Sequence, residues 1–270
     1  MNYTYKNHTF VISAYKESPY LEACIRSLKE QTLQSGICIA TSTYNGYIKG
    51  LAEKYNIPVF INDHSTGIAD DWNFAYRCAR TELVTIAHQD DVYDKYYVEE
   101  MLRQLNKSKN PLIFFANYNE IRNEKILSRG KMLFVKRVML IPMHFRIFSG
   151  FKFAKRLSIC MGNPIACWSV TYVCKNLPKV IFISQMKSNL DWEEWEKLSK
   201  VKGEFVYSGK VLTYHRVHRG SETSRTISEG NIRGMEDYEM FLKFWPKSVA
   251  KLIMKFYIKA EKCNEVEGNV

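Results

Sequence analysis

The chain has 270 residues, which is enough for one large domain or two small ones. Its hydrophobic content of 46% and aromatic content of 14% exclude a disordered protein and predict a packed core. The formal net charge of +11 indicates an anionic partner, such as a nucleotide, a nucleic acid or an acidic membrane surface.

Cysteine usage and the N-terminal residues bear on the compartment. Seven cysteines without a CxxC pair favour reduced, intracellular thiols over a disulfide framework or a zinc site. Residues 1–8 are polar and do not resemble a signal peptide, and no apolar run is long enough to span a bilayer. We therefore expect a cytoplasmic protein.

The first half of the chain alternates between strand and helix patterns. Short apolar runs predict strands over residues 9–14, 37–41, 58–62, 83–87 and 112–118. Helical spacing of apolar residues predicts helices over residues 20–32, 47–55, 68–80 and 96–106. This order implies right-handed crossovers and a largely parallel, doubly wound sheet.

The second half is more basic and less regular. Residues 138–157 mix apolar and basic side chains, which predicts either an amphipathic helix pair on an anionic membrane surface or a solvated helix that covers the far side of the sheet. Further patterns predict strands over 164–172, 205–207 and 211–214, a helix from Leu190, a polar loop over 215–224 and a basic helical tail over 230–262.

The buried strand over 83–87 ends abruptly in His88-Gln89-Asp90-Asp91. In open α/β sheets, ligands bind just beyond the carboxyl ends of the strands. Neighbouring carboxylates repel each other unless a cation or hydrogen-bond donors hold them, and Mg²⁺ is commonly held by one or two carboxylates plus substrate phosphates. The stretch therefore predicts either a metal–diphosphate site or a solvated turn that caps the next helix. The chain has no GxGxxG or Walker A pattern, which argues against a dinucleotide dehydrogenase or a P-loop NTPase.

Several stretches in order resemble family 2 glycosyltransferases with the GT-A fold, over about residues 9–225. Phe10–Glu17 and Leu21–Thr32 resemble the first strand and the first helix of that pattern, and Gly67–Asn73 resembles the segment before the acidic motif. His88–Asp91 stands at the DxD motif, Asp191–Trp195 resembles the later acidic motif, and Tyr214–Thr223 resembles a loop near the donor diphosphate.

The resemblance implies an α/β protein of GT-A type, with a Rossmann-like, mostly parallel sheet flanked by helices and a C-terminal helical extension. It implies a glycosyltransferase domain over residues 1–225, with a nucleotide-sugar-binding half (1–118) and an acceptor-side half (119–225). A basic helical extension over 226–270 follows.

The implied reaction is inverting transfer of a sugar from a nucleotide-diphosphate sugar, with UDP or dTDP favoured, to a hydroxyl acceptor. The expected acceptor is a lipid-linked glycan of bacterial surface polysaccharide synthesis, which would place the enzyme peripherally at the inner face of the plasma membrane. The alternative is a non-catalytic basic protein that binds nucleic acid or a nucleotide sugar on a degenerate GT-A fold. No nucleic-acid-binding motif is visible, so no nucleic acid partner is expected.

The resemblance also assigns roles to residues. Asp191 is the expected catalytic base, with Glu193 and Glu194 as alternatives, and Asp90 and Asp91 are expected to hold Mn²⁺ or Mg²⁺. The expected nucleotide-sugar contacts are Ala14, Tyr15, Glu17, Ser42, Asn73, His88, Gln89, Asp90, Arg216, His218 and Ser221, with Arg219 as a further cation of the same loop.

From the residues alone, several of these positions keep a second interpretation, and for Arg216, His218 and Arg219 it is an ordinary basic loop. Asp191 is also a suitable helix-capping acid, Tyr15 is also a suitable core aromatic, and His88 is also an ordinary polar residue at a strand end. The chain departs from the family pattern at two places: His88 stands at the first DxD position, and Thr41-Ser42-Thr43 replaces an Asp-rich segment.

Overall fold

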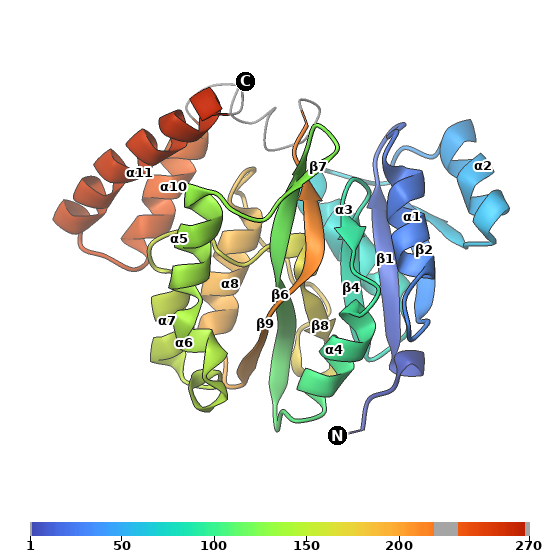
Figure 1. Cartoon of the computed structure of the whole chain (residues 1–270), viewed down its shortest axis with the longest axis horizontal. Helices are drawn as coiled ribbons and strands as arrows, with labels where there is room; N and C mark the ends of the chain where they lie inside the picture. Colours follow the sequence, from blue (N-terminus) through green and yellow to red (C-terminus); the bar gives the residue numbers. More distant parts are fainter. Residues whose placement is uncertain (1, 219–231, 268–270) are drawn as a thin grey trace.

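The computed structural model describes residues 2–218 and 232–267, with side chains to residue 257 (Figure 1). In this part of the chain, nine strands form one sheet in the order β3-β2-β1-β4-β8-β6-β9-β5, and β7 pairs with β6. The strands are β1 (His8–Ala14), β2 (Gly36–Thr41), β3 (Val59–Ile61), β4 (Leu83–His88), β5 (Val92–Tyr93), β6 (Pro111–Arg122), β7 (Lys125–Leu127), β8 (Thr171–Val173) and β9 (Glu204–Arg216).

Helices cover both faces of this sheet (Figure 1). The α-helices are α1 (Leu21–Lys29), α2 (Gly46–Tyr55), α3 (Ile68–Cys78), α4 (Tyr97–Leu105), α5 (Lys131–Met139), α6 (Ile141–His144), α7 (Lys152–Ile159), α8 (Leu190–Lys200), α10 (Ile232–Leu242) and α11 (Lys247–Glu267). The predicted C-terminal helices are therefore confirmed. No helix in the described residues is long and apolar enough to cross a membrane.

The longest strand ladders are parallel, as predicted. β1 runs parallel to both β2 and β4, and β6 runs parallel to β9. The short strand β8 lies antiparallel between β4 and β6. Because Ser13 is in register with His88 and Ala14 with Thr41, the carboxyl ends of β1, β2 and β4 lie side by side.

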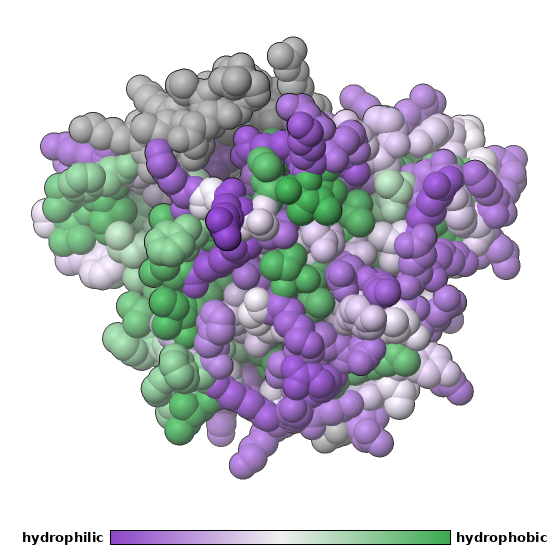
Figure 2. All heavy atoms as spheres, in the orientation of Figure 1, coloured by the Kyte–Doolittle hydropathy of each residue, from purple (hydrophilic) through white to green (hydrophobic). Residues whose placement is uncertain are grey.

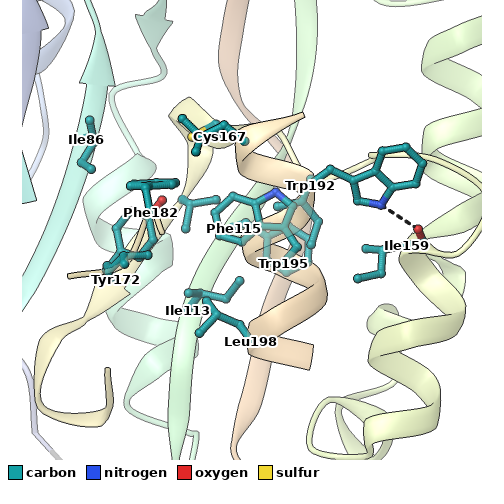
Figure 3. Packing of buried hydrophobic residues seen from close by; sticks show 14 of the residues in the cluster. Ile86, Ile113, Phe115, Ile159, Cys167, Tyr172, Phe182, Trp192, Trp195 and Leu198 are labelled. Carbon is teal, nitrogen blue, oxygen red and sulfur yellow. Dashed lines mark hydrogen bonds between the residues drawn. The ribbon is translucent and has the colours of Figure 1, made fainter. Parts of the chain in front are cut away.

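Alternating side chains of the central strands enter two hydrophobic clusters, one on each face. Phe10 and Ile12 of β1 pack with α1, α2 and α4, whereas Val11 packs on the opposite side with α3, α8, α10 and α11. Figure 3 shows part of this second cluster, in which the indole N–H of Trp192 donates a hydrogen bond to the carbonyl of Ile159 at 2.9 Å. Both faces are thus buried, which is why the central strands are almost continuously apolar.

The structure corrects two predicted elements. The predicted strand over 164–172 is a 3₁₀ turn (Cys167–Ser169) followed by the shorter β8. The carbonyls of Trp168 and Ser169 in this turn accept hydrogen bonds from the hydroxyls of Tyr93 and Tyr97 and not from a neighbouring strand. The two predicted strands at 205–207 and 211–214 form the single strand β9, whose register against β6 shifts after Ser208.

Candidate active site

A cleft of about 630 Å³ opens at the carboxyl ends of β1, β2 and β4, where ligands bind in open α/β sheets. Eight of the predicted site residues line it. These are Ala14, Tyr15, Ser42, His88, Gln89, Asp90, Asp191 and His218. Residues from five separate parts of the chain therefore meet at one place, as the order of the motifs predicts.

Gln89 connects the loop after β1 to the loop after β4 through two hydrogen bonds. The backbone N–H of Tyr15 donates to Oε1 of Gln89, and Nε2 of Gln89 donates to the carbonyl of Tyr15, both at 3.0 Å. The next residue, Lys16, has a left-handed backbone (φ 55°) and donates its N–H to the hydroxyl of Thr43. These contacts leave the Tyr15 ring 46% exposed at the cleft, so Tyr15 is not a core residue.

A second polar group lies at the end of β2. The hydroxyl of Ser42 donates to Oδ2 of Asp71 at 2.8 Å, and the side-chain amide of Asn62 donates to Oδ1 of the same carboxylate at 2.9 Å. Asp71 comes from the first turn of α3 and lines the cleft. A hydroxyl and a carboxylate thus face the cleft where the Asp-rich segment of the family pattern is missing.

Asp90 and His218 form an oxygen–nitrogen pair in the cleft. Nε2 of His218 lies 2.9 Å from Oδ2 of Asp90, and each side chain is about one-fifth exposed. Carboxylate oxygen and imidazole nitrogen are both ligands for Mn²⁺, and substrate phosphates commonly complete such sites. Among the described side chains, no group of three or more His, Cys, Asp or Glu residues could hold a metal ion on its own. The pair therefore fits a metal ion whose remaining ligands come from a bound diphosphate and water.

Asp91 is buried directly behind this pair. Its Oδ1 lies 2.8 Å from Nδ1 of His215 and accepts the backbone N–H of Arg216 at 3.0 Å. Burial raises the pKa of Asp91. Although burial lowers the pKa of His215, the adjacent Asp91 carboxylate leaves it above its ordinary value. As placed here, the predicted metal residue Asp91 anchors the end of β9 and does not line the cleft.

His88 lies in an aromatic wall of the cleft. Its ring stacks on Trp72 with centroids 5.1 Å apart, and Trp168 lies 5.9 Å away on a tilted plane. Trp168 in turn stacks on His215 at 4.0 Å. Nε2 of His88 is buried without a hydrogen-bond partner, and Nδ1 lies 3.9 Å from Asp91. An unpaired buried nitrogen of this kind is available to a ligand group in the cleft.

Asp191 is the member of the predicted acidic motif that lines the cleft. It sits in the first turn of α8, where its Oδ2 accepts from the side-chain amide of Asn163 at 2.7 Å and its Oδ1 accepts the N–H of Trp192 at 2.8 Å. Burial raises the pKa of Asp191, and the bond from Asn163 opposes that rise. A carboxylate with a raised pKa at a substrate cleft suits a general base.

The two alternative bases lie elsewhere. Glu193 forms ion pairs with Lys243 at 2.7 Å and Lys197 at 3.3 Å. Burial raises the pKa of Glu193, but these partners bring it below its ordinary value. Glu194 is 3% exposed beneath a separate apolar pocket, and burial raises its pKa to about 7. Neither side chain lines the large cleft, which favours Asp191 among the three.

The C-terminal helix α10 positions the start of α8. Three consecutive backbone N–H groups, of Lys187, Ser188 and Asn189, donate to the carboxylate of Glu236 at 2.7–3.0 Å. Lys187 and Ser188 also line the cleft. The helical extension therefore fixes the segment that leads directly to Asp191.

Other predicted contacts lie away from the cleft. Glu17 is exposed, and Asn73 is buried with its amide bound to the backbone of Ile181 and Phe182. Arg216 stacks on the Tyr20 ring and pairs with Glu124. Ser221 and Arg219 lie outside the described residues.

Sequence reasoning missed several cleft residues. Asp71, Trp72, Trp168 and His215 line the cleft, but none was assigned to it from the sequence. His215 was recognisable as a cation next to the assigned Arg216. Trp168 carried no comparable signal, because its position depends on the 3₁₀ turn that replaces the predicted strand.

Solved structures with this fold include several glycosyltransferases. One is S. aureus TarS 1–349 in complex with UDP-GlcNAc, with a TM-score of 0.62 and 14% identity; the match covers 93% of this chain and 71% of that 1–349 chain. A second is the mannosyltransferase PcManGT from Pyrobaculum calidifontis in complex with GDP-Man and Mn²⁺, with a TM-score of 0.63, 12% identity and coverage of 93% and 70%. A third is glucosyl-3-phosphoglycerate synthase from Mycobacterium tuberculosis in complex with UDP, with a TM-score of 0.54, 11% identity and coverage of 88% and 80%. At these identities the likeness shows the fold, and the mixed α/β architecture predicted as GT-A is confirmed.

Sequence comparison gives the family. No curated protein matches the chain. The family model described as "Glycosyl transferase family 2" matches residues 9–168, which is more than half of the sequence and includes β1, β2 and β4, at whose carboxyl ends the cleft opens. The chain therefore belongs to glycosyl transferase family 2.

Proposed function

We propose that the chain is an inverting, metal-dependent glycosyltransferase that transfers a sugar from a nucleotide-diphosphate sugar to a hydroxyl group. The observation that carries this proposal is the meeting of the Asp90–His218 pair and Asp191 in one cleft. The pair suits an anionic diphosphate with its metal ion, and Asp191 suits a base. The similar structures that hold UDP-GlcNAc, or GDP-Man with Mn²⁺, support the same class of donor.

The donor base would lie at the ends of β1 and β2. Uracil and thymine each present an N–H donor between two carbonyl acceptors. The Asp71 carboxylate lines the cleft and can accept the N–H, and the Ser42 hydroxyl, which donates its proton to Asp71, holds that carboxylate in place. The half-exposed Tyr15 ring supplies a stacking surface. This set supports UDP or dTDP as the nucleotide.

The diphosphate would lie against Asp90, His218 and His215. Mn²⁺ or Mg²⁺ held by Asp90 and His218 would stabilise the negative charge of the departing diphosphate. His215 also lines the cleft, and its raised pKa favours the imidazolium form, which attracts the same anion. Asp91 contributes indirectly, because it orients His215 and the end of β9.

Transfer then needs one proton acceptor. The acceptor hydroxyl oxygen attacks the anomeric carbon on the face opposite the leaving group, the bond from that carbon to the diphosphate oxygen breaks, and the hydroxyl proton passes to Asp191. The products are the glycosylated acceptor, with inverted configuration, and a nucleoside diphosphate. General-base assistance of this kind contributes about 10²–10⁴-fold in rate.

The proposed acceptor is a lipid-linked glycan of bacterial surface polysaccharide synthesis. Such an acceptor would bring the enzyme to the inner face of the plasma membrane. The family resemblance supports this part of the proposal, and the exposed apolar helices next to Asn163 are consistent with it.

The test is a panel of UDP-, dTDP- and GDP-sugars, measured by thermal shift and by release of nucleoside diphosphate, with and without Mn²⁺. A ligand that binds the native state raises the melting temperature by mass action. We expect Asp191→Asn to keep the donor-induced shift but to lose at least about 100-fold in release rate, and Asp90→Asn to lose the Mn²⁺-dependent part of the shift.

Glu193→Gln is the matched control, because Glu193 lies in the same turn of α8 but outside the cleft. It should retain release activity. Full activity of Asp191→Asn would reject the base assignment, and donor binding without release by the unaltered protein would favour a non-catalytic binding protein. Asp71→Ala should weaken binding of the uridine nucleotide itself about tenfold.

A further inference from the structure

The segment from α5 to α7 exposes an unusual number of large apolar side chains. Figure 2 shows hydrophobic residues gathered over these helices on the left of the view. The side chains that are more than 40% exposed, called here the α5–α7 face, are Phe134, Val135, Val138, Ile141, Phe145, Ile147, Phe148, Phe151, Phe153 and Leu157. Monomeric soluble proteins rarely expose contiguous apolar patches of this kind without a binding role.

Three aromatic side chains of the face lie next to one another, and the face is separate from the core. The rings of Phe145 and Phe148 lie 6.0 Å apart, and those of Phe148 and Phe151 lie 6.4 Å apart. The same helices bury a different set of residues against the protein, namely Leu133, Met143, Ala154 and Ile159. Both sides of the helical layer are therefore apolar, and only the inner side has a partner in the described residues.

The segment that carries the face has formal charges of one sign. Residues 125–190 contain no Asp or Glu. Some of their cations point inward, as Lys155 does when it donates to the carbonyls of Val201 and Gly203. Others are exposed beside the apolar side chains, and these are Arg129, Lys131, Arg146 and Lys152. Apolar side chains interleaved with exposed cations are the pattern of segments that lie in the interface of an anionic bilayer.

The segment that carries the α5–α7 face reaches the proposed base from its inner side. Asn163, four residues beyond the end of α7, donates to Asp191, and the Lys136 ammonium of α5 lowers the pKa of the same carboxylate against the effect of burial. A surface resting on this face would therefore lie on the outer side of the segment that contacts Asp191.

We propose that the α5–α7 face docks on an anionic lipid bilayer, with its apolar side chains in the headgroup–acyl boundary and its cations against lipid phosphates. A second copy of the chain is the less suitable occupant, because two faces of the same positive charge repel each other. Only the role of this docking, which is to bring Asp191 to a lipid-linked acceptor, rests on the proposed function. Docking itself can be measured without donor or acceptor.

The experiment is cosedimentation of the full chain with vesicles of phosphatidylcholine mixed with phosphatidylglycerol, and with vesicles of phosphatidylcholine alone. We expect binding to the mixed vesicles, little binding to the neutral ones, and a decrease with added salt. The double variant Ile147→Ser/Phe153→Ser, which changes the two most exposed apolar side chains of the face (74% and 77%), should lower the vesicle partition coefficient at least about tenfold.

Phe60→Ser/Ile61→Ser is the matched control for this change. These residues of β3 are also exposed apolar side chains, at 41% and 42%, but β3 forms the other end of the sheet. The control should bind vesicles as the unaltered protein does. A charge test uses Arg146→Glu/Lys152→Glu, which should lower partitioning into the mixed vesicles about tenfold or more.

Three results would overturn the proposal: absence of binding to the mixed vesicles, equal loss in the Phe60/Ile61 control, or a dimer in sedimentation that the Ile147/Phe153 variant abolishes. Donor-induced thermal shifts of each variant verify folding. They also separate the two proposals, because a failure to bind any nucleotide sugar leaves the vesicle result unaffected, and a failure to bind vesicles leaves the donor result unaffected.

Discussion

Replacing Glu194 by Gln should remove a pH-dependent destabilisation of the folded protein that this carboxyl causes. Glu194 is 3% exposed, its Oε2 has no hydrogen-bond partner, and burial raises its pKa from 4.5 to about 7. The folded protein therefore keeps this proton at pH values where the unfolded chain has released it. Because the folded state binds more protons between pH 4.5 and 7, the contribution of Glu194 to stability falls as pH rises through this window and levels off above pH 7.

The size of the effect follows from the same values. The difference between 4.5 and about 7, at about 1.4 kcal/mol per pKa unit, corresponds to about 3 kcal/mol. We expect Glu194→Gln to match the unaltered protein near pH 4.5 and to exceed its free energy of unfolding by up to about 3 kcal/mol at pH 8. Chemical denaturation at constant ionic strength across this range measures the difference.

Glu193→Gln supplies a control of opposite sign. The pKa of Glu193 is lowered by its lysine partners against the effect of burial, so its stabilising contribution is present above its ordinary pKa and is lost as pH falls. The Gln variant should thus be less stable than the unaltered protein at neutral pH. An effect of Glu194→Gln that is the same at pH 5 and pH 8, or a destabilisation at pH 8, would refute the reasoning.

Three further variants test other contacts of the fold and the cleft. Asn163→Ala removes a hydrogen bond that lowers the pKa of Asp191, so the acid limb of the pH–rate profile should move to higher pH; an unchanged limb would exclude this link. Gln89→Ala removes two hydrogen bonds to the Tyr15 backbone in the loop after β1, so the dissociation constant of the donor, measured by calorimetry, should rise about tenfold; an unchanged affinity would contradict this. Gly203→Ala should lower the free energy of unfolding by about 1–3 kcal/mol, because φ is +149° and the new methyl would lie 2.6 Å from Leu112; a neutral effect would show that the backbone can adjust.

The parallel half of the sheet was predictable because its signals are local. Each strand from β1 to β4 is a short apolar run between polar turns, and each intervening helix has regular apolar spacing. The parallel order then brings the strand ends together, which places Ser42, Gln89 and Asp90 in one cleft.

The remainder of the site depends on contacts between distant segments. Trp168 reaches the cleft because Tyr93 holds the 3₁₀ turn that carries it, and no pattern near residue 168 reveals this. Asn73 has the right type and position in the motif but turns its amide to the backbone of residues 181–182. The choice among the three acids of α8 likewise depends on which side of the helix faces the cleft, and that is set by tertiary packing.

The strand order has a consequence for engineering by segment exchange. β8 and β9 come from the second half of the chain, yet β8 lies between β4 and β6, and β5 pairs only at the outer side of β9. A chimera joined near residue 118 would therefore need a partner whose last strands reproduce this interleaving and its shift after Ser208. Shuffling donor and acceptor specificities in this chain should succeed sooner through loop grafts at the strand ends than through exchange of whole halves.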